Sequence, residues 1–464
     1  MNKTKIVCSI GPSSCDLNQV KSMIDAGMDV ARFNMSHGTH ESHRKMIDTV
    51  KLARKEKNVP LAIMIDTKGP EIRIKNFKNG KINLVEGQEF VLTTKEIDGD
   101  EKRVSVTYQN LPKFITAGTK ILLNDGYIEL TAKKVTKTDV VCTVSHGGEL
   151  SNHKSINIPG VKTDLPYLSE IDKKDILFAK EVDSEYLAIS FVNTPNDVKD
   201  IKKFLKTINF APKIISKIES MDGVKNFNKI LKESDGIMVA RGDLGVEIDF
   251  VKIPILQKEF IAKANDEGKI SITATQMLES MIKNPRPTRA EISDVANAVF
   301  DGTSAIMLSG ETASGLFPTQ AVQTMSDISY EAEHYIDGLD EPAKTHDTSK
   351  SLGYGAYSLT KTDDIKAIIV LTESGKTAED ICRYRPTVPI IACTPQEKTF
   401  HKMSMFYGVQ PILDESFTEI EDLKKSALQK AIKSKIVKKK DKILIVSGVV
   451  AGKGVSNNMT IEIL

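Results

Sequence analysis

Residues 213–241 read KIISKIESMDGVKNFNKILKESDGIMVAR, two short apolar runs separated by a stretch with helical spacing. The runs, Lys213–Ile218 and Gly236–Arg241, are rich in Ile and Val and are bounded by polar residues or glycine. Short apolar runs of this kind are typical of strands that are buried on both faces of a parallel sheet. The stretch therefore predicts a strand, a helix and a second strand.

Six further runs along the chain have the same character, and most are separated by stretches with helical spacing. One such stretch, residues 18–27, ends in Gly27, where a helix C-cap belongs. Eight strands alternating with helices predict an α/β fold of the (β/α)8 TIM-barrel type, which we assign to residues 1–70 and 165–338. The six further strands are expected at Lys5–Ser9, Val30–Asn34, Leu61–Asp66, Tyr186–Phe191, Ile270–Thr275 and Ala305–Ser309.

Two segments interrupt this alternation. Residues 71–164 contain short β-rich pieces and repeated turn signals such as Asn79-Gly80 and Asp98-Gly99, which predict a small β-barrel domain inserted in a barrel loop. Residues 339–464 begin with a polar connection and continue with apolar runs between helical stretches. They predict a third domain of α/β type, with strands at Ala367–Leu371, Ile390–Cys393, Pro411–Leu413 and Ile443–Val446.

The composition excludes several classes of protein. Among 464 residues, 64 Lys and Arg face 62 Asp and Glu, a balance that argues against a large nucleic-acid surface. No apolar run approaches the length of a membrane span, so neither a membrane nor a nucleic acid is an expected partner. Residues 1–10, MNKTKIVCSI, lack the apolar core of a secretory signal, and we expect a cytoplasmic protein. The five cysteines form no CxxC pair, which argues against a disulfide framework or a cysteine zinc site.

Charged residues follow several of the predicted barrel strands, at the end where such barrels carry their active sites. Taken singly, such residues more often cap a helix or form surface ion pairs, but the collection favours a site. Glu219 and Asp243 follow neighbouring strands, and two carboxylates suit Mg²⁺ or Mn²⁺ when water and substrate oxygens complete the shell. The cations Arg32, Lys217 and Arg73 beside such a metal indicate a phosphoryl-transfer pocket.

Two glycines follow the strand that ends in Ala240. Gly242 and Gly245 are expected to let the backbone turn tightly, so that the next helix directs free N–H groups toward an anion. The chain contains no GxxxxGK[ST] loop, so any nucleotide phosphates must be held in another way.

Six motifs carry a family resemblance. ARFNMSH (31–37), IDTKGPEIR (65–73), IISKIES (214–220), GIMVARGDLGVEI (236–248), residues 274–315 and ICRYRPTVPIIACT (381–394) together resemble the pyruvate kinases. The likeness covers essentially the whole chain. It implies a barrel with a lid domain inserted after the third strand and a C-terminal regulatory domain. It further implies a phosphotransferase (ATP:pyruvate 2-O-phosphotransferase) that converts phosphoenolpyruvate and ADP to pyruvate and ATP, the last step of glycolysis.

The resemblance also implies roles for the substrate side of the site. Arg32 is similar to the arginine that grips the transferred phosphate, and Lys217 to the lysine between donor and acceptor. Thr275 matches a substrate-contacting hydroxyl near the methylene carbon, which is protonated in the second step. Glu219 and Asp243 match the ligands of the catalytic Mg²⁺ (or Mn²⁺). Backbone contacts to the substrate carboxylate match Gly242 and Asp243.

On the nucleotide side, the resemblance implies a K⁺ site and phosphate contacts. The K⁺ ligands match Asn34, Ser36, Asp66 and Thr67. Glu71 stands where family members with Glu depend on K⁺ and members with Lys do not, since an ammonium group can replace the monovalent cation. The nucleotide-binding positions match Asn34, Met35, Ser36, His37, Arg73 and Lys154.

The resemblance also implies that the chain forms a homotetramer and that its C-terminal domain carries a third site, for an effector. The loop after the run Ala367–Leu371 carries hydroxyls, a glycine and a lysine before a helical stretch, a combination that suits a phosphate. It matches the family's loop for a phosphorylated allosteric effector. Glu373 departs from the Lys of the animal enzymes, so a monophosphate (ribose 5-phosphate, glucose 6-phosphate or AMP) fits at least as well as fructose 1,6-bisphosphate. The predicted phosphate-binding residues are Thr372, Ser374, Gly375, Lys376 and Thr377.

Two other functions are considered. A divalent-metal-dependent lyase acting on a pyruvate enolate would share the metal carboxylates and an arginine, but would not need Arg73, Lys154 or a K⁺ site. A non-catalytic metabolite-binding homologue should have lost Lys217 or a metal ligand, and this chain retains both. A coupled assay with ADP as substrate, compared with an assay that uses a keto-acid aldol, distinguishes the kinase from the lyase.

Overall fold

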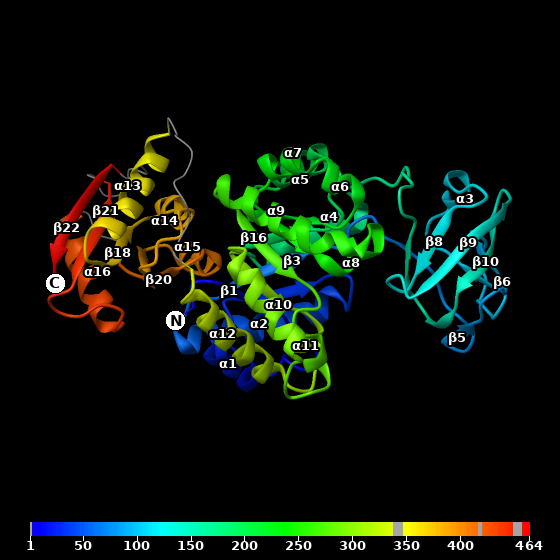
Figure 1. The fold of residues 1–464 in the computed structure, drawn as a ribbon, viewed down its shortest axis with the longest axis horizontal. Coiled ribbons are helices and arrows are strands. Elements are labelled where there is room, and N and C mark those ends of the chain that lie inside the picture. Colours follow the sequence, from blue (N-terminus) through cyan, green and yellow to red (C-terminus); the bar gives the residue numbers. More distant parts are fainter. Residues whose placement is uncertain (1, 337–346, 416–419, 449–456) are drawn as a thin grey trace.

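A computed structural model describes residues 2–336, 347–415, 420–448 and 457–464. Its central element is a closed barrel of eight parallel strands, which confirms the predicted fold class (Figure 1). Each of the eight predicted runs supplies one strand. Around the barrel the order is β1 (Lys5–Ser9), β17 (Ala305–Leu308), β16 (Ile270–Ala274), β15 (Gly236–Ala240), β14 (Lys213–Ile218), β13 (Tyr186–Ile189), β3 (Ala62–Asp66) and β2 (Val30–Asn34).

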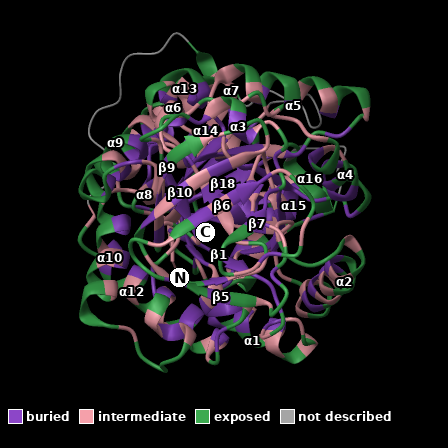
Figure 2. Ribbon diagram, turned by 90° about the vertical axis from the view of Figure 1, so that its right-hand side faces the viewer, coloured by how far each residue is buried: buried purple, intermediate pink, exposed green. Residues whose placement is uncertain are grey.

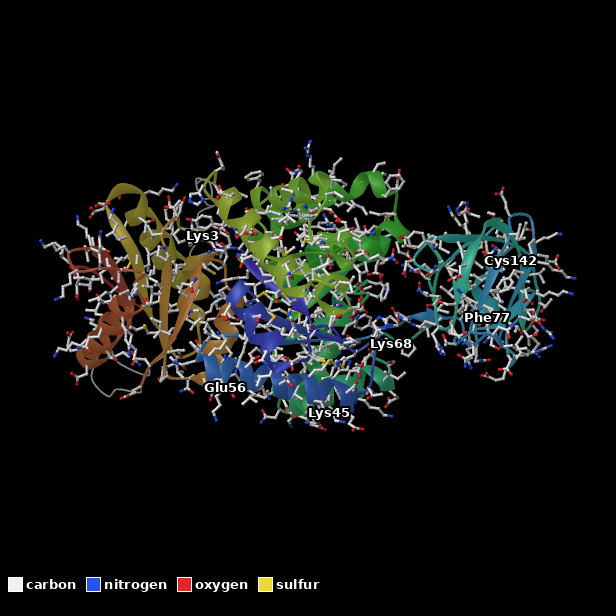
Figure 3. The ribbon with its side chains drawn as sticks, turned by 90° about the horizontal axis from the view of Figure 1, so that it is seen from below. Lys3, Lys45, Glu56, Lys68, Phe77 and Cys142 are labelled. Atoms are coloured by element: carbon white, nitrogen blue, oxygen red, sulfur yellow. The ribbon has the colours of Figure 1, made fainter. Side chains whose placement is uncertain are left out.

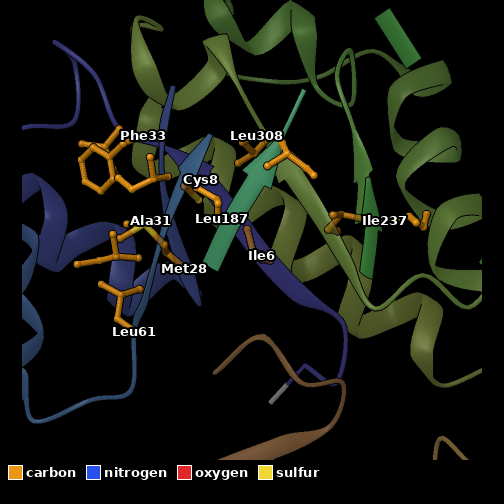
Figure 4. Close-up of a cluster of buried hydrophobic side chains, with 14 of the residues drawn as sticks. Ile6, Cys8, Met28, Ala31, Phe33, Leu61, Leu187, Ile237 and Leu308 are labelled. Atoms are coloured by element: carbon orange, nitrogen blue, oxygen red, sulfur yellow. The ribbon is translucent and has the colours of Figure 1, made fainter. Parts of the chain in front are cut away.

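Helices surround the barrel and bury its outer face. The first of them, α1 (Leu17–Ala26), ends at Gly27 with φ 117°, as the sequence predicts. Figure 4 shows part of the apolar layer between strands and helices, including Phe33, Leu187 and Leu308, all of which are fully buried. The other main helices are α2 (His40–Lys57), α4 (Glu170–Glu181), α5 (Pro195–Thr207), α6 (Met221–Lys225), α7 (Phe227–Glu233), α8 (Arg241–Glu247), α9 (Ile253–Asp266), α10 (Arg289–Phe300), α11 (Gly310–Ala313) and α12 (Pro318–Glu333).

The inserted segment forms a separate β unit between β3 and β13, at one end of the molecule (Figure 1). Its seven-stranded sheet curls so that its two edge strands approach each other. An isolated β-bridge between Ile74 and Val106 joins these edges. In Figure 3, Lys68 lies on the connection to this unit, while Phe77 and Cys142 lie within it. The order is β4 (Ile72–Arg73), β12 (Ser155–Asn157), β8 (Lys120–Leu123), β9 (Ile128–Val135), β10 (Asp139–His146), β6 (Glu89–Thr93) and β7 (Arg103–Ser105), with β11 (Gly148–Ser151) pairing β5 (Lys81–Leu84).

The C-terminal unit is a five-stranded sheet with helices, at the opposite end of the molecule (Figure 1). Four strands match the predicted runs, and the antiparallel edge strand β22 (Asn458–Ile463) was not predicted. The predicted boundary between 338 and 339 lies outside the described residues, and the three domain ranges stay predictions. The sheet order is β20 (Val409–Leu413), β19 (Ile390–Thr394), β18 (Ile365–Leu371), β21 (Lys442–Ser447) and β22, with α13 (Thr348–Thr362), α14 (Lys376–Cys382), α15 (Glu397–Lys402) and α16 (Ile420–Lys433).

The C-terminal unit closes the end of the barrel at which the strands begin. Lys5 at the start of β1 donates from Nζ to the carbonyl of Val409 (2.9 Å). One continuous buried cluster joins barrel-interior residues such as Met238 to Met405 and Phe406 of the C-terminal unit. The packed interior of the barrel therefore extends into the neighbouring domain.

Burial follows the expected pattern for this architecture. In Figure 2, viewed from the end of the inserted unit, the central strands are mostly buried and exposed residues lie on the surrounding helices and loops. Across the described residues, no helix combines the length and apolar character needed to cross a membrane.

His401 lies at the contact between α15 and the barrel. Its Nδ1 accepts a hydrogen bond from the backbone N–H of Leu61 (3.3 Å), which requires a neutral ring. Burial, together with the charges of Arg54 and Lys51, lowers the pKa of His401 to about 3. An ordinary histidine in the unfolded chain titrates near pH 6.5, so below that pH the unfolded chain binds a proton that the folded chain excludes.

We expect His401 to weaken the fold as the pH falls below about 6.5, by about 1.4 kcal/mol per pH unit until the folded pKa is reached. Above pH 6.5 the ring is neutral in both the folded and the unfolded chain, so His401 causes no loss of stability there. His401→Asn keeps an acceptor near Nδ1 but does not titrate, so its thermal midpoint should fall less between pH 7.5 and pH 5. Parallel pH profiles of the two proteins would contradict this assignment.

Candidate active site

A cavity of about 770 Å³ opens at the carboxyl ends of the barrel strands and is also lined by the inserted unit. Parallel strands bring their carboxyl ends to one rim, so residues far apart in sequence meet there. The predicted site residues that line the cavity are Arg32, Asn34, Ser36, His37, Glu71, Arg73, Lys154, Lys217, Glu219, Asp243 and Thr275.

The fully buried carboxylate of Asp66 lies between two of these cations. Arg32 donates to Oδ2 from Nε (2.7 Å) and Nη2 lies 2.6 Å from the same oxygen, while Nζ of Lys217 is 3.3 Å from Oδ1. Burial alone would raise the pKa of Asp66, but Lys217 and Arg32 outweigh it and hold that pKa below its ordinary value. Both cations are thus fixed in position by one anion.

Lys217 is held by further groups at the rim. Its Nζ lies 3.0 Å from Oε1 of Glu219 and donates to Oγ of Ser190 (2.8 Å). Burial favours the neutral amine, but Asp66 and Glu219 reverse that effect and raise the pKa of Lys217. The lysine therefore stays charged in a site that is shielded from water.

Ser190 is a functional position that the sequence patterns do not single out. Besides accepting from Lys217, its hydroxyl donates to the carbonyl of Thr67 (2.7 Å), and the residue is 3% exposed. The signal that could have found it is its place directly after β13, at the active end of the barrel.

Glu219 is buried (1% exposed), Asp243 is half-buried, and the charges of the two carboxyl groups interact. The backbone N–H of Phe191, whose φ is 53°, donates to Oε2 of Glu219 (2.6 Å). Burial and the charge of Asp243 raise the pKa of Glu219 against the opposing effect of Lys217, and burial also raises the pKa of Asp243. The two carboxylates repel each other, so both are more stable as anions when a cation lies between them.

These carboxylates fit a hard divalent cation such as Mg²⁺, which prefers oxygen ligands and keeps several waters or substrate oxygens. Within the described ranges, no group of three or more His, Cys, Asp and Glu side chains is arranged to hold a metal. A metal held here would take its remaining ligands from water and from the bound substrate.

The residues predicted for K⁺ lie along the adjacent strand ends. Asn34 and Asp66 are register partners on β2 and β3, and Oδ1 of Asn34 accepts from the backbone N–H of Ser36 (3.1 Å). Thr67 is buried beneath the cavity. These are oxygen donors with one formal charge among them, a set that suits a monovalent cation.

The inserted unit contributes the basic wall of the cavity. Arg73 donates from Nε to Oε2 of Glu71 (2.8 Å) and from Nη1 to the carbonyl of His153 (2.8 Å). Burial, followed by the charges of Arg73, Arg32 and Lys154, lowers the pKa of His37. Cations from two domains therefore act on one point, and this part of the cavity favours an anionic ligand.

The rim at β16 has a strained backbone. Thr275 has φ 69° and Gln276 has φ 54°, a conformation that is rare for a β-branched residue such as threonine. The backbone N–H of Gly242 donates to Oγ1 of Thr275 (2.7 Å), and Nη2 of Arg241 donates to the carbonyl of Thr275 (2.7 Å). Arg241 was not assigned a role from the sequence, and it holds this segment in place.

The expectation of a tight glycine turn after β15 is wrong. Helix α8 begins directly at Arg241, and both Gly242 and Gly245 lie inside it without a left-handed φ. The N–H of Gly242, which lies in this short helix, donates its hydrogen bond to Oγ1 of Thr275 on the neighbouring strand end. The chain changes direction through helical backbone, which any residue can adopt.

Three sets of predicted residues do not line the cavity. The side chain of Met35 packs against the apolar core, and Gly242 is not part of the cavity wall. Asp66 and Thr67 lie beneath it. The effector loop lies in the C-terminal unit, at the opposite end of the molecule from the inserted unit (Figure 1). The assignments of Met35, Gly242 and the loop stay predictions.

Arg241→Met should release the strained segment and lower stability by about 2 kcal/mol, because hydrogen bonds from a charged group are lost. Arg241 also pairs with Asp294 (2.7 Å), whose side chain is 36% exposed. Asp294→Asn leaves the bonds to Thr275 intact and should lower the thermal midpoint much less. Equal losses in the two variants would show that the ion pair, and not the carbonyl contacts, matters.

Comparisons with known proteins agree with this geometry. The family profile described as "Pyruvate kinase, barrel domain" matches residues 1–322, and "Pyruvate kinase, alpha/beta domain" matches residues 350–462. Pyruvate kinases from Staphylococcus aureus strains MRSA252 and USA300 are each 44% identical over 472 residues, which cover 100% of this chain and 81% of each relative. A crystal structure of a pyruvate kinase from Cryptosporidium parvum superposes with a TM-score of 0.91 at 39% identity, covering 100% of this chain and 96% of that one. The chain belongs to the pyruvate kinase family.

Proposed function

We propose that the cavity transfers the phosphoryl group of phosphoenolpyruvate to ADP and yields pyruvate and ATP. The observation that carries this proposal is the pair of cations, Arg32 and Lys217, fixed by Asp66 beside the carboxylates Glu219 and Asp243. A phosphoryl group passing through a loose transition state needs positioning and charge stabilisation more than covalent help. This arrangement supplies both.

Arg32 and Lys217 would grip the phosphoryl group during transfer. Each cation is oriented before the substrate binds, so little reorganisation is needed as charge develops on the transferring group and on the enolate. By analogy with the loss of an oxyanion-hole donor, each is worth about 3–4 kcal/mol. Thr275, at the rim, is the proposed contact near the methylene carbon that is protonated next.

Glu219 and Asp243 are the residues that would hold Mg²⁺ (or Mn²⁺). When bound, the metal would neutralise charge on the substrate carboxylate, the enolate oxygen and the phosphate. The K⁺ site is proposed at Asn34, Ser36, Asp66 and Thr67.

Arg73 and Lys154 are the proposed contacts to the nucleotide phosphates, beside the segment 34–37. They belong to the inserted unit, which covers one side of the cavity. We propose that this unit closes over the bound substrates. Closure would exclude water and prevent loss of the phosphoryl group to hydrolysis.

Lys217→Met should lower the turnover number at least 100-fold and leave Mg²⁺ binding nearly unchanged, because the metal ligands are retained. Glu219→Gln is the matched variant and should instead raise the Mg²⁺ concentration needed for activity. Turnover should be measured with phosphoenolpyruvate and ADP at saturation, and metal binding by calorimetry. More than a tenth of the original turnover in Lys217→Met would remove the assigned role.

Activity should require K⁺, since Glu71 stands where a lysine would otherwise supply the monovalent charge. Glu71→Lys should relieve the requirement and lower the maximal rate, because it also removes the partner of Arg73, whose Nη2 lies 2.7 Å from Oε2. The test compares rates in KCl and in tetramethylammonium chloride at equal ionic strength. Equal rates of the unaltered protein in both salts would contradict the requirement.

A phosphorylated effector is proposed to act through residues 372–377, in a homotetramer. Support comes from the loop's place at the carboxyl end of β18 and from Gly375, which is the N-cap residue of α14 and has a φ of 81°. Oγ1 of Thr372 accepts from the N–H of Gly375 (3.0 Å), which shapes the turn. A cytoplasmic location remains the prediction made from the sequence.

Calorimetric titration with ribose 5-phosphate, glucose 6-phosphate, AMP and fructose 1,6-bisphosphate tests the effector loop. We expect at least one monophosphate to bind, and Ser374→Asp to weaken its binding at least tenfold through charge repulsion, since a tenfold loss is a 1.4 kcal/mol effect. If none binds, or if the variant binds equally well, the loop is only a turn.

A further inference from the structure

Ser190 lies directly after β13, the barrel strand between β3 and β14. Within β13, Ala188 is the register partner of Asp66 on β3. Ile189 is the register partner of Ser216 on β14. Ser190 is buried and lies in the wall of the cavity at the barrel rim. Its side chain is therefore placed where it can contact both neighbouring strand ends at once.

The hydroxyl proton of Ser190 is directed toward the end of β3. Oγ donates to the carbonyl of Thr67 (2.7 Å), and Oδ1 of Asp66, the other acceptor on this side, lies 3.3 Å from it. A hydroxyl has one proton and two lone pairs. Because both neighbours on β3 are acceptors, the proton is used there, and Oγ is left as an acceptor toward β14.

Lys217 on β14 uses that acceptor. Its ammonium group carries three N–H donors. Three oxygens lie close to Nζ, namely Oγ of Ser190 at 2.8 Å, Oε1 of Glu219 at 3.0 Å and Oδ1 of Asp66 at 3.3 Å. Glu219 and Asp66 are themselves proposed ligands of Mg²⁺ and K⁺. Of these three partners, Ser190 is thus the nearest and the one that has no proposed cation to hold.

The neutral hydroxyl acts on the lysine differently from the two carboxyl groups. Attraction between an ammonium and a carboxylate depends chiefly on distance, whereas a short hydrogen bond also requires that the N–H point at its acceptor. Ser190 therefore fixes the direction of one N–H of Lys217, and with it the rotation of the other two. Lysine has a flexible four-carbon stem, so its charge is placed accurately only where such partners restrain it.

Ser190 is itself held by the two connections to the inserted unit. Gly69, on the connection that leaves the barrel, has a φ of 72°, and a Cβ atom there would come within 2.9 Å of Cβ of Ser190. On the returning connection, the hydroxyl of Tyr167 donates to the carbonyl of Ser190 (3.0 Å). This close packing leaves Ser190 little room to turn away from Lys217.

We propose that Ser190 is a positioning residue, whose hydroxyl fixes the direction in which Lys217 presents its N–H groups to the transferring phosphoryl group. The inference rests on the proposed function, since it concerns a cation assigned to that transfer. Ser190 acts through Lys217 and not by touching the substrate. It orients a charge before the reaction begins, and charges that are oriented in advance stabilise a transition state most effectively.

The first test measures kcat and KM for phosphoenolpyruvate and ADP in the full-length protein, at saturating Mg²⁺ and K⁺. Ser190→Ala should lower kcat about tenfold, as expected for the loss of a hydrogen bond to a charged group. The KM for ADP should stay close to its original value. Calorimetric binding of Mg²⁺ should also be unchanged, because Glu219 and Asp243 are retained. A general distortion of the rim would alter all three quantities.

Ser216→Ala is the matched control. Ser216 precedes Lys217 on β14 and faces the opposite side of the strand, where its hydroxyl is hydrogen-bonded to that of Ser234 (2.7 Å). This variant also removes a buried hydroxyl, so it should lower the thermal midpoint, yet kcat should not change. If Ser190→Ala does not fold, Ser190→Cys takes its place, and its weak sulfur acceptor should lower kcat in the same direction.

A double-variant cycle separates positioning from direct contact with the substrate. When Lys217→Met is already present, Ser190→Ala should change the remaining turnover by less than about twofold, because the group that it orients is absent. An equal loss of turnover with and without Lys217 would assign the hydroxyl to the substrate instead. An unchanged kcat in Ser190→Ala, or a loss that additional K⁺ restores, would also overturn the positioning role. Absence of turnover in the unaltered protein would overturn the proposed function.

Discussion

The carboxylate of Asp66 is the constraint on which the catalytic rim depends. It is fully buried, and Arg32 and Lys217 converge on its two oxygens. Without that anion, two cations and a phosphate site could not share one small volume, because the cations would repel each other and remain solvated. The barrel makes the arrangement accessible by placing the ends of β2, β3 and β14 at one rim, and the rest of the site is arranged around these three side chains.

Much of the fold follows from the sequence because buried parallel strands leave an unmistakable pattern. Runs such as Val30–Asn34 are buried on both faces of the sheet and are therefore largely apolar, so their composition alone locates them. The charged residues after these strands were equally visible, since the barrel topology leaves only one rim for them. Family motifs suggest roles that spacing cannot assign, such as the proposed contact of Lys217 with the phosphoryl group and of Glu219 with the metal.

The sequence was silent where tertiary contacts decide the outcome. Strand β22 is half exposed and has no continuous apolar run, so its pairing with β21 becomes visible only in three dimensions. Ser190 acts through one hydroxyl that any serine carries, and only its neighbours give it a role. The glycines of α8 do not mark a turn, because glycine permits a turn without requiring one. Backbone strain at Thr275 likewise has no signature in residue type.

The shared interior of the barrel and the C-terminal unit has a consequence for synthesis of the chain. Ribosomes complete the barrel long before they make Met405 and Phe406, the apolar residues that cover its base. A nascent barrel therefore exposes its lower interior until Phe406, within the last quarter of the chain, has emerged, and transiently exposed apolar surface of this kind promotes aggregation. Removal or exchange of the last domain would leave the same apolar surface without its cover.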